Sequence, residues 1–171
     1  FRSSGLKLDE RGYVTVDGYG RTNLDGVWAL GDITPGHALA HRAFEQGITI
    51  AEKIAGADPK PVLDDTVPQV VFSFPEAASV GLTLDQAKAR EDVVEPKETA
   101  YPMLSNARML MSGEGGSMTV VSGAFANNPD MQVVLGVHIV SPIASDLIAE
   151  AEQLVGNRVP LADAARLIHP H

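Results

Sequence analysis

Two histidines, His169 and His171, stand in the last four residues of this 171-residue sequence, Ile168-His169-Pro170-His171. Imidazole titrates near neutral pH, so a histidine can take a proton from a reacting group and later return it. The chain contains no cysteine, which excludes a thiol nucleophile, a thiolate metal site and a disulfide within these residues. The histidines show none of the spacings typical of zinc ligands, and we therefore expect no metal site.

Gly31 and Asp32 form a second candidate site, because they come directly after a short apolar run over residues 27–30. Such a run is typical of a buried strand that ends at a glycine turn. Glycine lets the backbone approach a ligand closely, and a carboxylate at the carboxyl end of a strand can accept hydrogen bonds from a sugar-like diol. The dipeptide alone is weak evidence, since an aspartate at a strand end more often caps a turn or helix.

The elements that must position Gly31 and Asp32 lie in the first 56 residues. Residues 8–16 predict a hairpin, and residues 38–55 predict a helix with Gly56 where a C-terminal cap is expected. Residues 57–66 hold two prolines and three aspartates, and they are either a linker or a long ordered loop.

The second part of the chain predicts a small α+β domain, with an antiparallel sheet flanked by helices. The expected strands cover residues 67–74, 93–101, 117–125 and 132–140, and the proline at position 68 suits an edge strand or a strand entry. The expected helices cover residues 83–90, 143–154 and 160–167, and Thr83 and Gln86 have the spacing of a capping box.

Two further features of this part favour structure over chemistry. The glycine-rich run over 113–116 lacks the Lys-Ser/Thr pair of a phosphate loop, and it predicts a hairpin loop. Four methionines are expected to fill gaps in a core or an interface: Met103, Met109, Met111 and Met118.

The composition limits the partners of the chain. With 13 Lys and Arg against 22 Asp and Glu, the formal charge is −9, which argues against binding to nucleic acid or to an anionic membrane surface. No apolar run reaches the roughly 18 to 20 residues that a membrane-spanning helix needs. We therefore expect neither a nucleic-acid partner nor a membrane partner, and a cytoplasmic location.

The first part of the chain resembles the pyridine-nucleotide disulfide oxidoreductases. Thr22, Trp28, Gly31 and Asp32 are similar to the second flavin-binding motif of that family, and the run Leu39-Ala40-His41-Arg42-Ala43 is similar to the family segment that comes after this motif. The resemblance implies that Asp32, next to Gly31, binds the ribityl chain of FAD. It also implies that the backbone at Leu39, Ala40 and His41 faces the flavin ring.

The second part is similar to the interface domain of the same family, in residues 67–81, 106–108 and 136–150. The C-terminal run looks like the start of the H-x-H-P-T signature of that family. The resemblance then implies that His171 is the catalytic acid/base, and a competing register would give this role to His169. The spacing from Glu150 favours His171.

The resemblance also implies a domain organisation. Residues 1–56 are expected to be the strand–turn–helix remnant of an FAD-binding domain, residues 57–66 a linker, and residues 67–171 an interface or dimerisation domain truncated at its C-terminus. The implied parent enzyme oxidises dihydrolipoamide with NAD through FAD and a cysteine pair, and the piece alone is expected to be inactive. The implied partners are a second subunit, in a homodimer, and the lipoyl domains of 2-oxo acid dehydrogenase complexes.

Two alternatives stay open on the sequence alone. The chain can act as an isolated, non-catalytic dimerisation module. The parent can also belong to another branch of the family, of the mercuric, mycothione or glutathione reductase type.

Overall fold

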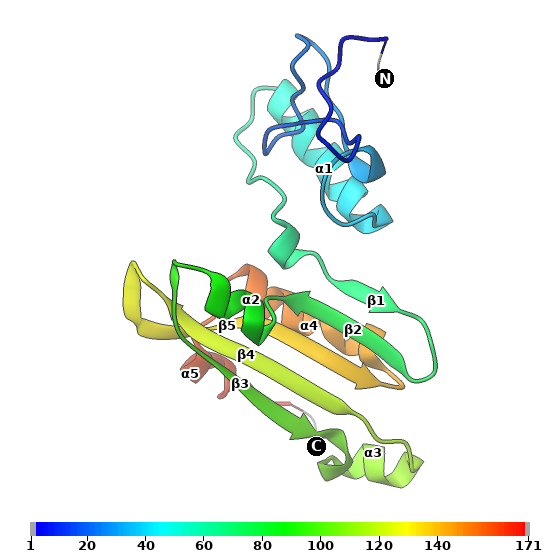
Figure 1. Ribbon diagram of the computed structural model, residues 1–171. Coiled ribbons are helices and arrows are strands. Elements are labelled where there is room, and N and C mark those ends of the chain that lie inside the picture. The colour runs from blue at the N-terminus through cyan, green and yellow to red at the C-terminus, as the bar shows by residue number, and fades with distance from the viewer. Residues whose placement is uncertain (1–2, 170–171) are drawn as a thin grey trace. The chain divides into compact units, whose positions relative to one another are not determined.

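Figure 1 shows a computed structural model of the chain, which describes residues 3–169. The chain divides into two compact units, of which the first ends at Asp64 and the second begins at Asp65. No helix in the described residues has the length and apolar character that crossing a bilayer requires.

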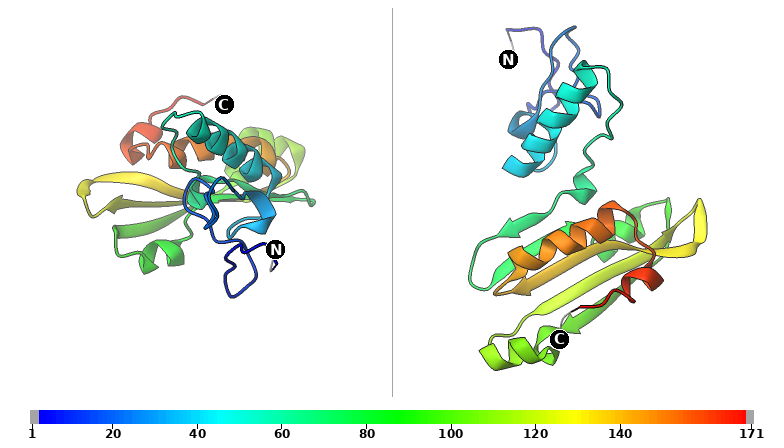
Figure 2. Two further views of the ribbon diagram at one scale, coloured as in Figure 1. Left: turned by 90° about the horizontal axis from the view of Figure 1, so that it is seen from above. Right: turned by 180° about the vertical axis from the view of Figure 1, so that it is seen from behind.

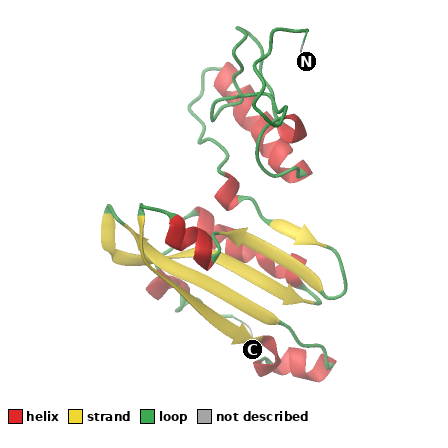
Figure 3. Cartoon of the chain, in the orientation of Figure 1, coloured by secondary structure: helices red, strands yellow, loops and turns green. Residues whose placement is uncertain are grey.

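The first unit is built around one helix, α1 (Ala40–Ile54), close to the expected range of 38–55. The helix buries Arg42, Thr49 and Ile50, and Gly56 comes after its end with a φ of +87° that suits a glycine cap. Over residues 3–63 one 3-10 turn, η1 (Gly31–Ile33), packs against α1, and the remaining residues form loops, turns and isolated bridges (Figure 3).

The prediction of β-strands in this unit, over residues 8–16 and 27–30, is wrong. The hairpin over 8–16 is reduced to one bridge between Leu8 and Val14, and the strand over 27–30 to one bridge between Arg21 and Trp28. A strand needs a hydrogen-bonded ladder with a neighbour, and in the described residues neither segment has a neighbour that extends its bridge into a ladder.

The second unit contains a five-stranded antiparallel sheet in the order β1-β2-β5-β4-β3, which confirms the expected α+β fold. Its strands are β1 (Gln69–Val71), β2 (Glu76–Gly81), β3 (Val93–Pro102), β4 (Ser117–Phe125) and β5 (Asn128–Ser141). Its helices are α2 (Leu84–Ala89), α3 (Ala107–Ser112), α4 (Ala144–Gly156) and α5 (Leu161–Ala164), with 3-10 turns η2 (Asp64–Thr66), at its junction with the first unit, and η3 (Met103–Ser105). The short strand β1 lies at an edge, as Pro68 suggested.

The structure adds two elements that the sequence did not predict. Strand β2 fills the position between β1 and β5, and α3 lies in the connection between β3 and β4. The glycine-rich run over 113–116 therefore links α3 to β4, and the expectation of a simple hairpin loop is wrong. Gly113 ends α3 with a φ of +71°.

Helix α4 covers one face of the sheet, as the view from behind in Figure 2 shows. On this face Ile148 and Ala151 of α4 form one buried cluster with Val137 and Ile139 of β5. A second buried cluster contains Val133 and Leu135 of β5 together with buried residues of its neighbours: Leu82, Ala87, Val93 and Val121. Strand β5 thus contributes to both cores.

Three of the four methionines pack as expected. Met103 and Met109 are buried in the α4 cluster and Met118 packs against it, as expected for residues that fill gaps. Met111 does not fill a gap within the chain, because it is 82% exposed.

The starts of two helices show how side chains fix the fold. Thr83 and Gln86 form the expected capping box at α2: the Gln86 N–H donates to the Thr83 hydroxyl at 3.2 Å, and the Thr83 N–H donates to the Gln86 side chain at 2.8 Å. Helix α4 has no side-chain cap from Ile143. Instead the Glu76 carboxylate, from the start of β2, accepts the Ser145 N–H at 2.8 Å, and this hydrogen bond lowers the pKa of Glu76.

Candidate functional site

Gly31 docks the turn that carries Asp32 onto α1. The Gly31 N–H donates to the Gln46 side chain at 2.9 Å, and the backbone has a φ of +70°, which favours glycine. A Cβ atom at this position would lie 3.3 Å from the Cβ of Ala43. Position 31 therefore requires a small residue, because the turn that carries Asp32 approaches α1 closely.

Asp32 comes next as an exposed residue in η1. Within residues 3–169 its carboxylate makes no hydrogen bond or ion pair with another side chain or backbone group. Both carboxylate oxygens are therefore accessible to hydroxyl donors of a ligand, and the binding of a sugar-like diol at Asp32 stays a prediction.

The N-terminus of α1 belongs to the same unit. Leu39 precedes the helix in an extended conformation and gives it no side-chain cap, and Ala40 and His41 are exposed. The first turn of a helix carries partial positive charge and backbone N–H donors without intrahelical acceptors. An anionic or electron-rich group is therefore the ligand that this end of α1 suits best.

Arg42 is a residue whose importance sequence reasoning missed. Its side chain is 5% exposed; Nε donates to Asp64 at 2.7 Å and Nη2 donates to the Pro35 carbonyl at 2.6 Å. Nη1 has no partner in the described residues. The side chain lines a cavity of about 350 Å³ within the first unit and ties α1 to the segments on either side of it. An arginine inside the motif next to apolar residues was the signal that could have shown it.

His169 lies against α4 at the end of the described chain. Its Nε2 is 2.6 Å from a carboxylate oxygen of Glu150, and its Nδ1 is 3.0 Å from the Leu167 carbonyl oxygen. Both ring nitrogens thus face acceptors, and the hydrogen bond to Glu150 raises the pKa of His169. The predicted acid/base His171 lies outside the described residues, so its position stays a prediction.

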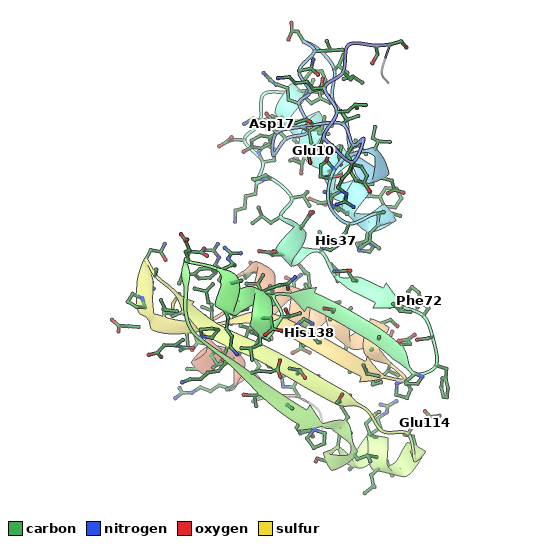
Figure 4. All side chains as sticks on the ribbon, in the orientation of Figure 1. Glu10, Asp17, His37, Phe72, Glu114 and His138 are labelled. Carbon is green, nitrogen blue, oxygen red and sulfur yellow. The ribbon has the colours of Figure 1, made fainter. Side chains whose placement is uncertain are left out.

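His138 forms a second polar contact, between β2 and β5 (Figure 4). Its Nε2 lies 3.1 Å from the Leu82 carbonyl oxygen, which can only accept, so Nε2 carries a proton, and its Nδ1 lies 2.6 Å from the Ser79 hydroxyl oxygen. The pair links two neighbouring strands. In the part of the chain that the structure describes, no group of three or more His, Asp or Glu side chains is arranged to hold a metal ion.

Comparison with known families assigns the chain to a class. Residues 67–171 match the dimerisation domain of the pyridine nucleotide-disulphide oxidoreductases, and residues 1–47 match the preceding family domain, also described as pyridine nucleotide-disulphide oxidoreductase. The chain belongs to this family of flavoprotein oxidoreductases, as the resemblance in both parts of the sequence predicted.

Individual relatives point to one branch of this family. The dihydrolipoyl dehydrogenase of Cupriavidus necator is 40% identical over 169 residues, which are 98% of this chain and 34% of that protein. The dihydrolipoyl dehydrogenase of Thermus scotoductus is 36% identical over 98% of this chain and 35% of that protein. The chain therefore spans about a third of the length of these relatives.

Solved structures agree with this assignment. The crystal structure of LpdA from Mycobacterium tuberculosis has a TM-score of 0.84 and 31% identity, over 98% of this chain and 35% of that one. The HOCl-induced flavoprotein disulfide reductase RclA from Escherichia coli has a TM-score of 0.79 at 21% identity, covering 99% of this chain and 38% of that one, and it shares the fold.

Proposed function

We propose that the chain serves as the C-terminal third of an NAD-dependent dihydrolipoyl dehydrogenase. In this proposal the first unit completes an FAD site, the second unit forms a homodimer, and His171 handles a proton. The observation that carries the proposal is the exposed Asp32 carboxylate in the same unit as the start of α1, to which Leu39 gives no side-chain cap. The identities of 35% to 40% to dihydrolipoyl dehydrogenases support the choice of this branch over the mercuric, mycothione and glutathione reductase types.

The donor and acceptor groups of the first unit fit FAD. Asp32 would accept hydrogen bonds from ribityl hydroxyls, and Gly31 would let the backbone approach the cofactor. The start of α1, at Leu39, Ala40 and His41, would favour negative charge on the flavin ring. When bound, FAD supplies the transfer of electrons between a dithiol–disulfide pair and NAD.

The two C-terminal histidines would have separate tasks. His171 would take the proton of the incoming dithiol, since a thiolate is the reactive form in disulfide exchange. His169 already places both ring nitrogens on acceptors, which favours its protonated form and makes it a poor base. This supports the register in which His171 is the acid/base.

The proposed partners are those that the dihydrolipoyl dehydrogenase branch implies. A second copy of the chain would complete the active site, and lipoyl domains of 2-oxo acid dehydrogenase complexes would deliver the substrate. The proposal also places the enzyme in the cytoplasm, where thiols stay reduced.

Substitutions in the intact flavoprotein that carries this chain test the function. We expect His171→Gln to lower the rate of dihydrolipoamide oxidation by roughly 10²- to 10⁴-fold while flavin absorbance is retained. His169→Gln should have a much smaller effect, and Asp32→Ala should reduce the flavin content. Full activity of the His171→Gln enzyme, or undiminished flavin in the Asp32→Ala enzyme, would contradict the corresponding assignment.

A further inference from the structure

Hydrogen bonds on the loop side fix the shape of η1, the turn that carries Asp32. The Gly31 carbonyl accepts the Thr34 N–H at 3.0 Å and the Thr34 hydroxyl at 2.8 Å. The Ile33 carbonyl accepts the Val14 N–H at 2.8 Å. Thr34 and Val14 are both buried. The turn is therefore closed at its end and tied to the first loop of the unit.

The face of α1 that meets this turn consists of small residues. A Cβ atom added to Gly31 would lie 3.3 Å from the Cβ of Ala43, and one added to Gly47 would lie 4.0 Å from the Leu30 side chain. Ala43 and Gly47 are four positions apart and share one face of the helix. Packing against such small residues lets the turn approach closely. It is non-directional, however, and does not determine where along the helix the turn lies.

Gln46 supplies the directional contact on this face. Its Oε1 accepts the Gly31 N–H at 2.9 Å, and the side chain is half-buried. Gln46 comes three positions after Ala43, so the two residues are neighbours on the helix surface. A hydrogen bond weakens steeply when its donor moves out of line. The contact with Gln46 therefore determines the position of the turn along α1.

The same helix carries this anchor and one of the two proposed cofactor contacts. Gln46 lies six positions after Ala40, the first residue of α1, which is about 9 Å along the axis at a rise of 1.5 Å per residue. The other proposed contact, Asp32, is joined directly to Gly31. The hydrogen bond between Gly31 and Gln46 thus places the Asp32 backbone relative to the first turn of α1.

We propose that Gln46 is a positioning residue for flavin binding. It holds the Asp32 turn at the place on α1 where one FAD molecule can meet both Asp32 and the start of the helix. The inference rests on the proposed function, in which these two groups contact FAD. It adds a residue that acts through the backbone of Gly31 rather than on the cofactor.

Amide hydrogen exchange of the complete 171-residue chain tests the anchor without any cofactor. The Gly31 N–H should be protected, and Gln46→Leu should accelerate its exchange at least about tenfold, because leucine has similar bulk but no acceptor. Gln46→Glu keeps an acceptor and should keep the protection. Glu45→Leu, at the exposed neighbouring position of α1, is the matched control. Equal exchange of Gly31 in all four chains would overturn the anchor.

Flavin affinity of the intact flavoprotein tests what the anchor does. After removal of the bound cofactor, we expect Gln46→Leu to raise the FAD dissociation constant about tenfold or more, and Gln46→Glu to change it less than about threefold. Glu45→Leu should leave it unchanged. Titration of flavin fluorescence measures all three. If circular dichroism shows that the leucine variant does not fold, Gln46→Ala takes its place, because alanine removes the acceptor without adding apolar bulk.

A double-mutant cycle separates positioning from general stabilisation. If Gln46 acts by placing Asp32, Gln46→Leu should weaken FAD binding less than about threefold in a protein that already carries Asp32→Ala. If Gln46 only stabilises the first unit, the effects of the two substitutions multiply. A dissociation constant that equals the product of the two single effects would therefore overturn the positioning role.

The outcomes separate this inference from the proposed function. Undiminished flavin binding in the Asp32→Ala enzyme would overturn the flavin part of the function and the inference with it. Weakened flavin binding in the Asp32→Ala enzyme, together with normal binding in the Gln46→Leu enzyme, would overturn the inference alone. The proton transfer assigned to His171 depends on none of these results.

Discussion

His169 shows how one neighbour changes the chemistry of a residue. The carboxylate of Glu150 and the carbonyl of Leu167 stabilise the protonated imidazole, so the pKa of His169 lies above its ordinary value of 6.5. A group whose folded-state pKa is raised stabilises the fold below its unfolded pKa. That contribution is lost as the pH rises through the folded-state pKa.

Replacing the partner of His169 should therefore be visible as a shift in its titration. We expect Glu150→Gln to lower the pKa of His169 towards 6.5, because the largest cause of the raised value is removed. NMR titration of the imidazole protons measures it, and Glu152→Gln on the same helix is the matched control. An unchanged His169 pKa in the Glu150→Gln chain would show that the pair does not form in solution.

At the scale of elements, two paired glycines let β2 and β5 come close. Gly81 and Gly136 are register partners at the end of β2, where the Leu82 N–H donates to the Leu135 carbonyl at 2.9 Å. A Cβ atom at Gly136 would overlap the Leu82 carbonyl oxygen, and one at Gly81 would overlap the Leu135 carbonyl oxygen. Backbone atoms of a paired strand cannot move aside as a flexible side chain can.

The substitution Gly136→Ala should accordingly destabilise the second unit, by at least about 2 kcal/mol. Gly47→Ala is the control. Gly47 lies inside α1, and the added methyl group would meet only the Leu30 side chain, at 4.0 Å. There we expect a gain of about 0.5 to 1 kcal/mol, since alanine is the better helix former. Denaturant unfolding measures both, and equal stability of the Gly136→Ala chain would refute the clash.

The helices and strands also show which elements could be predicted from the sequence. Thr83 and Gln86 carry a complete local signal, so the start of α2 was found from two residues. Strand β2 was missed because Glu76, Ala77 and Ala78 have low strand propensity, and its position depends on pairing with β1 and β5. The strand expected over 27–30 failed for the related reason that ladders require neighbours distant in sequence.

Some residues of the candidate site could be predicted from the sequence, and others could not. Gly31 and Asp32 were found because a contiguous motif carries them, whereas the buried Arg42 was missed because its partners Pro35 and Asp64 lie outside the helix. The role of Glu76 at the start of α4 was also hidden, since 69 residues separate it from Ser145. Contacts between distant positions need the fold before they can be recognised.

At the scale of the whole molecule, the first unit presents apolar side chains to solvent. Phe44 and Ile48, one turn apart on α1, are 73% and 53% exposed. The chain spans about a third of the length of its relatives, and in the proposed enzyme the remaining part of the FAD domain would cover such a face.

Polar replacements on this face should leave the chain as stable as before. We expect Phe44→Ser and Ile48→Ser to change the free energy of unfolding by less than about 0.5 kcal/mol each and to raise solubility. Ile50→Ala, on the buried side of the same helix, should cost roughly 3 kcal/mol. Denaturant unfolding and light scattering measure the two effects, and a large loss from Phe44→Ser would show that this side chain is packed.

The long strand β5 has a consequence for how the second unit can come apart. It lies between β2 and β4 and supplies Val137 to one buried cluster and Leu135 to the other. If β5 detached, only the ribbons β1-β2 and β3-β4 would remain, and an isolated two-stranded ribbon is marginally stable at best in water. We therefore expect the second unit to unfold in a single cooperative transition.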